Sequence, residues 1–491
     1  MSFAVAAGHR QTAEAAAEVL RADGSAVDAV IAGACTAMVA EPVLASLLGG
    51  GFLMVAPADG PVRCLDAFVQ APSEALAEGD ADVETVEADF GGARQVFHIG
   101  AGTVAVPGLA AALFEAHARH GRMDLADLLA PAAGMARAGV TVTAYQAHLF
   151  QVVAPIFRAD PAVRRLYAPD DSLPTEGTVL RNSAFADVLD VLAAEGPRFV
   201  QEGEIAAALA DLPGAHLSRA DLAAYAPTWL RPQRLRRGTA EIALTPPPSL
   251  GGLMIALALS HLPARPGAAE IAQAFQQVEI ARAGKHTSLD PALVAEMRRV
   301  STAHTLSARG TTHLSVVDAA GNGAALTLSN GTGAGRLVPG TGIMPNNMLG
   351  EEDLLPDGPT SWRPAQRLAS MMCPTVLSRP DGSRTLLGSG GSNRIRTALA
   401  QVLLHLADHG APLDEAIAAP RVHLEGARTP RLDVEAGWSE ETVAHLCQIW
   451  PEATFWAQSS MFFGGVHAVT TGPRGSTGAG DPRRDGQVIL G

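Results

Sequence analysis

The sequence predicts a layered α/β or α+β protein. Strand and helix signals occur in both halves of the chain, but they do not alternate as regular strand–helix–strand units, which argues against a Rossmann sheet or a barrel. The 491 residues, of which 47% are hydrophobic and 18% charged, are sufficient to bury a large core. The expected elements fall into three blocks along the chain.

The first block combines two helices with a strand hairpin. Residues 11–22 are rich in alanine with helical periodicity and end at an Asp-Gly pair, and a second helix is expected over 26–40. Three glycines at 49–51 then indicate a turn that leads into a buried strand. Residues 62–68 are the expected hairpin partner of that strand.

The second block, from about residue 104 to 230, is a series of helices. Helical periodicity covers five segments in it: 109–117, 125–138, 185–194, 202–212 and 219–224. We therefore expect an α-rich lobe in this part of the chain.

Strands return in the last block. Residues 313–318 and 323–329 are separated by Ala-Ala-Gly-Asn, which is typical of a hairpin. A strand over 240–244 precedes three consecutive prolines, which exclude regular structure before the next helix begins. Further strands are expected over 384–387, 432–434, 466–471 and 487–490, and a helix over 394–409.

Composition excludes several classes of function. There are 36 basic and 50 acidic residues, so a net charge of −14 disfavours binding to nucleic acid or to an anionic membrane. The four cysteines are widely spaced and no His, Cys, Asp or Glu cluster has ligand spacing, so we expect no disulfide framework, metal or cofactor. The N-terminus lacks a secretory pattern, and the longest apolar stretch is too short and glycine-rich to span a membrane. We expect a cytoplasmic protein.

A Gly-Thr peptide at the start of an expected strand is the first candidate for chemistry. If the bond between Gly310 and Thr311 were cut, Thr311 would carry a hydroxyl nucleophile together with an α-amine of pKa about 7.7–8.0, which can act as its general base. A bare Thr-Thr-His triplet is otherwise a common strand start. We interpret His313 as a packing or hydrogen-bonding residue, because strand alternation is expected to turn it away from the nucleophile.

Motifs that surround this peptide extend over nearly the whole chain. They are Gly24-Ser-Ala-Val-Asp28, Leu48-Gly-Gly-Gly-Phe52, Val106-Pro-Gly108, Pro246-Pro-Pro-Ser249, Thr311-Thr-His-Leu-Ser-Val-Val-Asp318, Asn346-Asn347, Gly388-Ser-Gly-Gly391 and Gly478-Ala-Gly-Asp-Pro-Arg483. In this order, they resemble those of the γ-glutamyltranspeptidase (glutathione hydrolase) family of N-terminal nucleophile (Ntn) hydrolases.

The resemblance implies an α+β fold of four layers, an αββα sandwich, with the α-rich lobe in addition. It also implies a single domain over residues 1–491 that is made as a precursor and cleaves itself between Gly310 and Thr311. The large subunit would then be 1–310 and the small subunit 311–491, and the two would stay associated.

The resemblance implies catalytic roles as well. Thr311 would attack an acyl carbon, and the acyl-enzyme would be released to water or an acceptor amine. Ser329 matches a hydroxyl residue that bonds to the nucleophile and assists self-cleavage. Backbone N–H groups of Gly390 and Gly391 would bind the oxyanion, with an uncertainty of one residue because Ser392 could replace a family glycine. The expected partners are therefore a small acyl compound and water or an amine.

The pocket for the head group of the substrate departs from the family at one decisive position. Family members carry an arginine that binds the substrate α-carboxylate, and Phe68 stands at the matching place. Asn330 matches an asparagine that binds the amino-acid head group of the substrate. Glu351 falls near the acidic ligand of the α-amine, although Glu352 and Asp353 are equally well placed.

Two further positions make this pocket more apolar. Ser370 matches one serine of a family pair, but Met371 takes the place of the second. Met348 stands where a glutamine is common. The expected substrate-binding residues thus combine polar and apolar side chains.

We therefore expect a self-processing amidase or acyltransferase for a small acyl compound other than an ordinary γ-glutamyl peptide. One alternative is a conventional glutathione hydrolase whose carboxylate partner is another arginine, with Arg394 the nearest motif candidate. A second is a biosynthetic member that uses the threonine on an acyl carbon–carbon bond. A third is an uncleaved precursor that serves as a binding protein.

Overall fold

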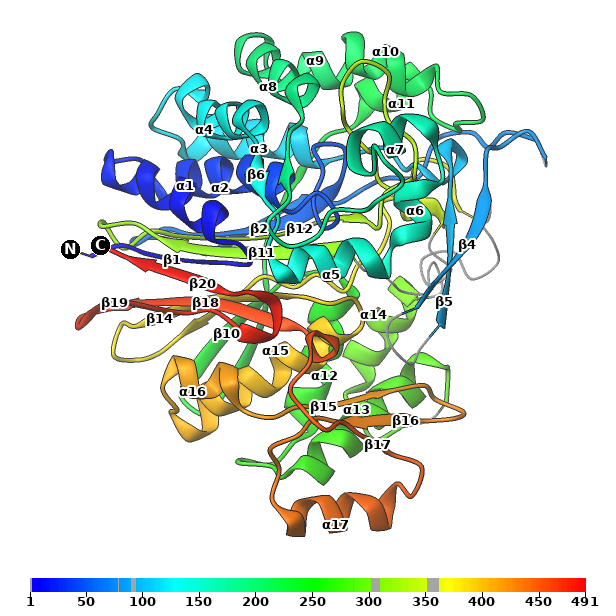
Figure 1. Cartoon of the computed structure of the whole chain (residues 1–491). Helices are drawn as coiled ribbons and strands as arrows, with labels where there is room; N and C mark the ends of the chain where they lie inside the picture. Colours follow the sequence, from blue (N-terminus) through cyan, green and yellow to red (C-terminus); the bar gives the residue numbers. More distant parts are fainter. Residues whose placement is uncertain (1, 78, 90–93, 286, 302–309, 351–361) are drawn as a thin grey trace.

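The computed structural model describes residues 2–77, 79–89, 94–285, 287–301, 310–350 and 362–491. Within these residues, two antiparallel sheets stack at the centre of the molecule (Figure 1). The first has the strand order β20-β1-β11-β12-β2-β3-β8, with β1 Ala4–Ala7, β2 Gly50–Ala56, β3 Arg63–Ala67, β8 Thr228–Leu230, β11 Gly310–Val317, β12 Gly323–Gly331 and β20 Gln487–Leu490. The second has the order β19-β18-β14-β13-β10-β9, with β9 Gln233–Arg237, β10 Ala240–Leu244, β13 Thr375–Ser378, β14 Arg384–Gly390, β18 Gly465–Gly472 and β19 Gly475–Ala479.

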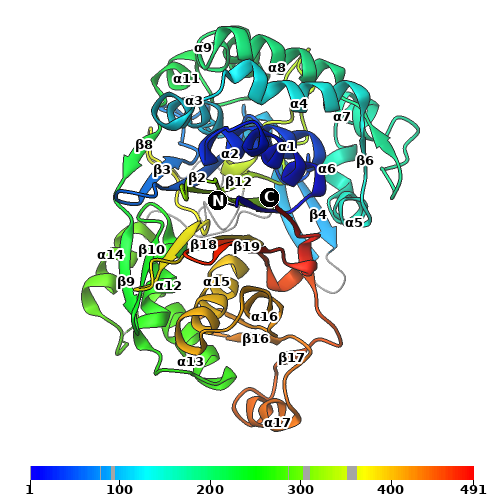
Figure 2. The ribbon, with the colours of Figure 1, turned by 90° about the vertical axis from the view of Figure 1, so that its left-hand side faces the viewer.

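Helices cover the outer faces of both sheets. Helices α1 (Arg10–Arg21) and α2 (Ala26–Ala40) lie on the first sheet, and α12 (Leu250–His261) and α15 (Arg394–Leu404) lie on the second (Figures 1 and 2). Every residue of α2 is buried, because α1, α3 and α4 pack against it in addition to the sheet. The layers confirm the expected αββα sandwich.

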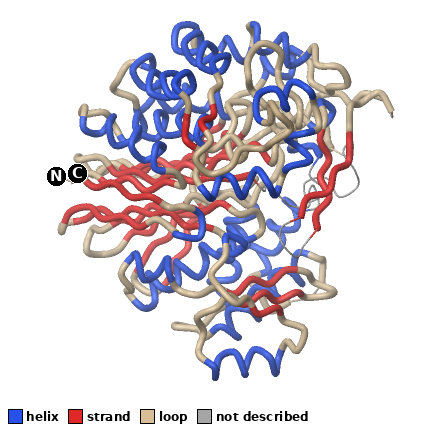
Figure 3. The backbone as a smooth tube through the Cα atoms, in the orientation of Figure 1, coloured by secondary structure: helices blue, strands red, loops and turns tan. Residues whose placement is uncertain are grey.

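Most helices of the α-rich segment lie beyond α1 and α2, as the helical segments between residues 104 and 230 predict (Figure 3), whereas α5 (Ala144–Val152) lies beside the two sheets (Figures 1 and 2). Its helices are α3 Leu109–His120, α4 Leu125–Ala138, α5 Ala144–Val152, α6 Ala154–Arg158, α7 Pro161–Tyr167, α8 Ser183–Glu195, α9 Arg198–Gln201, α10 Glu204–Ala210 and α11 Arg219–Ala224. The short strands β6 (Val140–Thr141) and β7 (Val179–Leu180) pair within it.

Several elements were not among those expected from the sequence. They include strand β1, the hairpin of β4 (Glu84–Asp89) and β5 (Arg94–Ile99), strands β9 and β13, helices α5 to α7, and helices α13 (Ala268–Arg282), α14 (Pro291–Ser301), α16 (Leu413–Ala418) and α17 (Glu440–Ile449). A small sheet of β15 (Val422–Glu425), β16 (Arg431–Val434) and β17 (Thr454–Phe455) adjoins them. No helix in the described ranges is long and apolar enough to cross a membrane.

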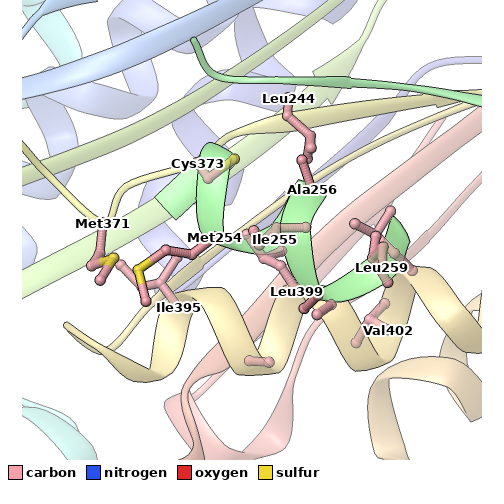
Figure 4. Close-up of a cluster of buried hydrophobic side chains, with 14 of the residues drawn as sticks. Leu244, Met254, Ile255, Ala256, Leu259, Met371, Cys373, Ile395, Leu399 and Val402 are labelled. Atoms are coloured by element: carbon pink, nitrogen blue, oxygen red, sulfur yellow. The ribbon is translucent and has the colours of Figure 1, made fainter. Parts of the chain in front are cut away.

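The apolar layer under the second sheet holds α15 in place. Side chains of α12, among them Met254 and Leu259, pack against Ile395, Leu399 and Val402 of α15 (Figure 4). Because α15 follows directly on β14, this packing also positions the glycine-rich turn between the two elements. The turn lies next to the start of β11, where the candidate nucleophile is found.

Candidate active site

Thr311 lies at the start of β11, near the middle of the first sheet between β1 and β12. It is buried and pairs with Ser329 of β12, whereas Gly310 pairs with Gly331. The register therefore shifts between Gly310 and Thr311, and Asn330 is the additional residue on β12. Bulges of this kind break the regular ladder and redirect side chains. The irregularity coincides with the peptide bond that the sequence analysis predicts to be cleaved.

Ser329 contacts this peptide bond directly. Its Oγ donates a hydrogen bond of 2.5 Å to the carbonyl oxygen of Gly310 and accepts one of 3.0 Å from the N–H of Gly331. A donor on a carbonyl oxygen makes the carbonyl carbon more electrophilic and stabilises negative charge that develops on the oxygen. Ser329 thus stands where a group assisting attack on Gly310 is needed.

The glycine-rich turn approaches Thr311 from the second sheet. A Cβ atom on Gly390 would lie 2.2 Å from the carbonyl oxygen of Thr311, so no side chain fits at this position. The chain then turns into α15 through Gly391 and Ser392, which have φ values of +124° and +57°. Both candidate registers for the oxyanion site, Gly390–Gly391 and Gly391–Ser392, therefore lie in the turn beside Thr311, the candidate nucleophile.

Asn330 is buried beside the same peptide. Its Oδ1 lies 3.0 Å from the position that a Cβ on Gly310 would take, and neither Oδ1 nor Nδ2 has a hydrogen-bond partner among the described residues. A buried amide without partners is costly, because it has given up its bonds to water. The side chain is available to a polar group of a ligand.

Phe68 follows β3 and lies in the apolar core. Its side chain is 0% exposed, and its ring stacks on that of Phe52 with a centroid distance of 5.9 Å. It belongs to the same buried cluster as Met348 and Met371. The position at which the family resemblance places a carboxylate-binding arginine therefore carries an apolar side chain in apolar surroundings.

Arg367, which the sequence analysis did not single out, lies beside the backbone of Phe68. It donates bonds of 2.7 Å to the Phe68 carbonyl and 2.8 Å to the Ala226 carbonyl, and its Nε lies 3.4 Å from Asp66 Oδ2. The guanidinium is thus occupied by protein groups. Burial raises the pKa of Asp66, and the charge of Arg367 opposes that shift.

Of the remaining predicted substrate-binding residues, the structure describes Ser370 and Met371 but not Glu351. Ser370 is buried, its carbonyl accepts the N–H groups of Leu250 and Gly251, and its Oγ accepts from the Met372 N–H. Met371 points toward Met254 of α12 and Ile395 of α15 (Figure 4). Glu351 lies outside the described residues, as do Glu352 and Asp353.

His313 corrects one expectation. It is two residues from Thr311 on the same strand, so the two side chains share a face of the sheet, and the expected turn away from the nucleophile was wrong. Its ring nitrogens contact Thr327 Oγ1 and Ser315 Oγ at 2.8 Å each, in agreement with a hydrogen-bonding role. Burial lowers the pKa of His313 well below its usual value, so the imidazole stays neutral.

Glu41 is a further residue that the sequence analysis missed. It follows α2, and its carboxylate accepts bonds from Thr312 Oγ1 at 2.7 Å and Thr12 Oγ1 at 2.9 Å. Burial raises the pKa of Glu41 to about 7, against the opposing effect of the two hydroxyl groups. The only local signal is a Glu-Pro pair at the end of a predicted helix. Only the fold places this acid under the residue next to the nucleophile.

Arg394, the alternative carboxylate partner, begins α15. Its Nε donates a bond of 3.2 Å to the Phe462 carbonyl, and its guanidinium lies 4.3 Å from the centroid of the Phe462 ring. It faces a cavity that Gly310 and Gly391 also line. Among the described residues, no three His, Cys, Asp or Glu side chains are grouped to hold a metal ion.

Comparison with solved structures shows that the fold of this chain is shared with a known acylase structure. The fold superposes on the crystal structure of cephalosporin acylase from Bacillus halodurans with a TM-score of 0.83 and 24% identity, over 99% of this chain and 95% of that one. The chain therefore has the same fold as that acylase structure, and Thr311 begins a central strand of it.

Sequence comparison then identifies the family. The γ-glutamyltranspeptidase family model matches residues 12–281 and 267–491, and the chain belongs to that family. It is 31% identical to the acylase ACY 1 proenzyme of Pseudomonas sp. (strain V22), over 99% of this chain and 93% of the relative. It is 28% identical to the glutathione hydrolase proenzyme of Pseudomonas aeruginosa, over 86% and 82%. The chain is therefore an enzyme of the acyl hydrolase and transferase type.

Proposed function

We propose that this enzyme is a self-processing acylase that cleaves amides of a small acyl group other than γ-glutamyl. It cuts its own Gly310–Thr311 bond and then uses Thr311 as an N-terminal nucleophile. The relatives named acylase, at 31% identity over nearly the full length, support this direction over glutathione hydrolysis. Water is the default acceptor, and an amine is the alternative.

The environment of Phe68 carries the proposal. A γ-glutamyl substrate brings an α-carboxylate, and burying a carboxylate without a charged partner is strongly unfavourable. Phe68 supplies no charged partner, and the nearby Arg367 is already bonded to Asp66 and to backbone carbonyls. Met371 adds a second apolar side chain to the same cluster. These surroundings favour an acyl group that has no carboxylate at this position.

The residues support self-processing by an acyl shift. The Thr311 hydroxyl attacks the Gly310 carbonyl carbon, the peptide C–N bond breaks, and the chain is joined through an ester to Thr311 Oγ. Ser329, bonded to the Gly310 oxygen, stabilises the charge that develops there. Water then hydrolyses the ester, which releases the Gly310 carboxylate and leaves Thr311 with a free α-amine and hydroxyl.

Turnover repeats this chemistry on a substrate amide. The Thr311 α-amine accepts the hydroxyl proton as Oγ attacks the acyl carbon, and the proton passes to the leaving amine as the amide bond breaks. Backbone N–H groups of the Gly390–Ser392 turn hold the oxyanion, and Asn330 binds a polar group of the acyl part. Water then attacks the acyl-enzyme, which yields the acid and restores Thr311.

A conventional glutathione hydrolase is the second candidate, because Arg394 is a cation within the same part of the fold. The two candidates differ in the effect of Phe68. In the conventional enzyme, Phe68 is irrelevant to the carboxylate and glutathione is a good substrate. In the acylase, the absence of an arginine at this position lowers kcat/KM for every γ-glutamyl substrate.

The test compares substrates on the processed enzyme. We expect kcat/KM for γ-glutamyl-p-nitroanilide to fall below that for neutral acyl p-nitroanilides by roughly 30-fold to several-thousand-fold, which corresponds to about 2–5 kcal/mol for an unpaired buried carboxylate. Phe68→Arg should reduce this difference in kcat/KM between the γ-glutamyl and the neutral substrates, while the apolar control Phe68→Leu should not. Cleavage of glutathione by the wild type with kcat/KM of ~10⁴ M⁻¹s⁻¹ or more contradicts the proposal.

A further inference from the structure

The segment that follows α2 contacts the chain on both sides of the Gly310–Thr311 bond. After the bond, Thr312 Oγ1 donates its 2.7 Å hydrogen bond to the Glu41 carboxylate. Before the bond, the carbonyl oxygen of Val43 lies 2.5 Å from the position that a Cβ on Gly310 would take. The backbone turns directly after Glu41, whose carbonyl accepts the N–H groups of the residues three and four positions later. One short turn therefore adjoins the candidate cleavage site on both sides.

The carboxyl group of Glu41 is fixed from several directions. It is 0% exposed, and its second oxygen accepts a bond of 2.9 Å from Thr12 Oγ1 of α1. Gly8, which follows β1, leaves room for it: a Cβ there would lie 2.8 Å from Thr312 Oγ1, 3.1 Å from Glu41 Oε2 and 3.3 Å from His467 Nε2. Elements α1, β1, β11 and β18 therefore meet at this carboxyl group.

The ionisable groups that face Glu41 from β18 and from the two termini of the sheet do not neutralise it. His467 accepts the N–H of Asp481 at 3.3 Å through Nδ1, and burial lowers the pKa of His467 to about 4, so the ring is neutral. Burial also lowers the pKa of His9 at the start of α1. Asp485, two residues before β20, is an acid, and its charge adds to the effect of burial in raising the pKa of Glu41. None of these groups supplies a compensating positive charge.

Tyr145 of α5 and Arg484 complete the charged surroundings. Burial raises the pKa of Tyr145; the charge of Arg484 opposes this shift, and the charge of Glu41 adds to it. The guanidinium of Arg484 donates to the Met461 carbonyl at 3.3 and 3.1 Å, beneath the glycine turn. Of the acids and bases that surround Glu41, none is bonded to Thr312 in the way that Glu41 is.

Cleavage before Thr311 creates a new charge close to this acid. The freed α-amine belongs to the residue next to Thr312, so chain geometry places it within roughly 8 Å of the Glu41 carboxylate. A negative group at this distance favours the ammonium form and raises the pKa of the amine, whereas burial lowers it. The ammonium in turn favours the ionised carboxylate, so the two groups titrate as a coupled pair.

We propose that Glu41 is a positioning residue for Thr311, which holds the nucleophile strand through Thr312 and sets the proton affinity of the Thr311 α-amine. This inference rests on the proposed function, because it requires the processed N-terminus. It adds a residue that acts on the general base without contact to the substrate. The hydrogen bond to Thr312 orients the strand, and the carboxylate charge determines the pH range in which the amine can accept a proton.

The first experiment measures kcat/KM against pH for a neutral acyl p-nitroanilide. In Glu41→Gln, the rise of activity should move to lower pH by about 0.5 to 1.5 units, because the ammonium loses a nearby negative charge. Glu18→Gln, which changes an exposed acid of α1, is the charge-matched control and should leave the profile in place. An unmoved profile in processed Glu41→Gln overturns the inference.

A second comparison separates the hydrogen bonds from the charge. Glutamine can keep bonds to both threonines, so kcat of Glu41→Gln at its plateau should stay within about threefold of the wild type, with KM unchanged. Glu41→Ala should move the profile equally but lower kcat roughly tenfold further, because both bonds are lost. Equal kcat values for the two variants contradict the positioning role.

Processing of every variant is first checked on a denaturing gel. If Glu41→Gln stays one chain, Thr12→Val replaces it in the test. This variant leaves the nucleophile strand unchanged and removes one of the two hydroxyl groups that favour the ionised carboxylate. The profile should then move in the same direction by a smaller amount, and an unmoved profile overturns the inference.

Chemical labelling separates this inference from the proposed function. The rate at which acetic anhydride modifies the Thr311 α-amine is measured against pH by mass spectrometry, with Lys285, the only lysine of the sequence, as internal reference. A lower midpoint in Glu41→Gln than in the wild type supports the inference even if no test amide is cleaved. Equal midpoints contradict it even if the enzyme proves to be an acylase. A wild type that stays one chain contradicts the proposed function and this inference together.

Discussion

The Ser329 hydroxyl donates a 2.5 Å hydrogen bond to the carbonyl oxygen of Gly310, one residue before the candidate nucleophile Thr311. The two residues are 19 positions apart in the sequence, and the hairpin of β11 and β12 brings them together. The bond acts on the carbonyl that Thr311 must attack in self-cleavage. It links the hairpin predicted from the sequence to the chemistry proposed for it.

Processing should therefore depend on both residues. We expect the purified wild type to separate into chains 1–310 and 311–491 on a denaturing gel, with Thr-Thr-His at the new N-terminus. Thr311→Ala should remain one inactive chain, and Ser329→Ala should process roughly 10- to 100-fold more slowly because one donor to the carbonyl is lost. Ser378→Ala on β13 is the control. A fully active single chain would show that Thr311 is not an N-terminal nucleophile.

Gly390→Ala should disrupt the same centre from the second sheet. The added Cβ would lie 2.2 Å from the Thr311 carbonyl oxygen, so β14 and β11 must separate locally. We expect loss of processing or a fall in kcat of at least about 100-fold, the scale of a lost oxyanion contact. Gly134→Ala in α4 has open space around its Cβ and should leave both unchanged. Normal activity of Gly390→Ala excludes close contact between turn and nucleophile.

The pH dependence of kcat/KM should follow the ionisation of the Thr311 α-amine. The ammonium form cannot accept the hydroxyl proton, so activity should rise with pH through an apparent pKa at or below about 7.7–8.0, since burial disfavours the charged amine. His313 cannot produce this rise of activity with pH (the basic limb of the profile), because burial lowers its pKa and already keeps it neutral. A processed His313→Ala variant should retain the limb even if its rate falls. Disappearance of the limb in that variant identifies histidine as the base.

Glu41 and His467, a buried residue of β18, should influence stability in opposite directions over overlapping pH ranges. Glu41 has a folded pKa of about 7, above the ordinary 4.5, so its ionisation reduces stability as pH rises from about 4.5 to 7. His467 has a folded pKa of about 4, below the ordinary 6.5, so its protonation in the unfolded chain reduces stability as pH falls from about 6.5 to 4. Each effect is on the order of 3 kcal/mol.

Glu41→Gln removes the first of these effects and leaves the second. Both proteins carry Thr311→Ala so that each stays one chain. The melting temperature of the Glu41→Gln variant should rise relative to that of the parent as pH increases from 4.5 to 7. Glu14→Gln on the exposed face of α1 is the control. A constant difference across this range would show that Glu41 is ionised throughout.

The sequence by itself determined the strand that begins with the candidate nucleophile, and its hairpin. Gly310-Thr311 and the turn before Gly323 are local signals: a glycine next to a hydroxyl residue, β-propensity on both sides and a short polar connection. The helices on either side of Gly24 follow in the same way from periodicity and the Asp-Gly stop, and in the structure Ser25 with Asp28 forms the capping box that starts α2. Such features depend on neighbours in the chain, so the chain order reveals them.

Only the tertiary structure decided which distant residues meet at Thr311. No local signal reveals the contacts of Glu41 with Thr312, of Arg367 with Phe68, or of Arg484 with the glycine turn, because each is an ordinary charged residue whose partners lie tens to hundreds of positions away. The environment of Phe68 is similar: a phenylalanine after a strand reveals its burial against Phe52 only when two sheets pack. Burial and charge pairing are properties of the packed layers, since desolvation and Coulomb energy depend on distance in space rather than separation along the chain.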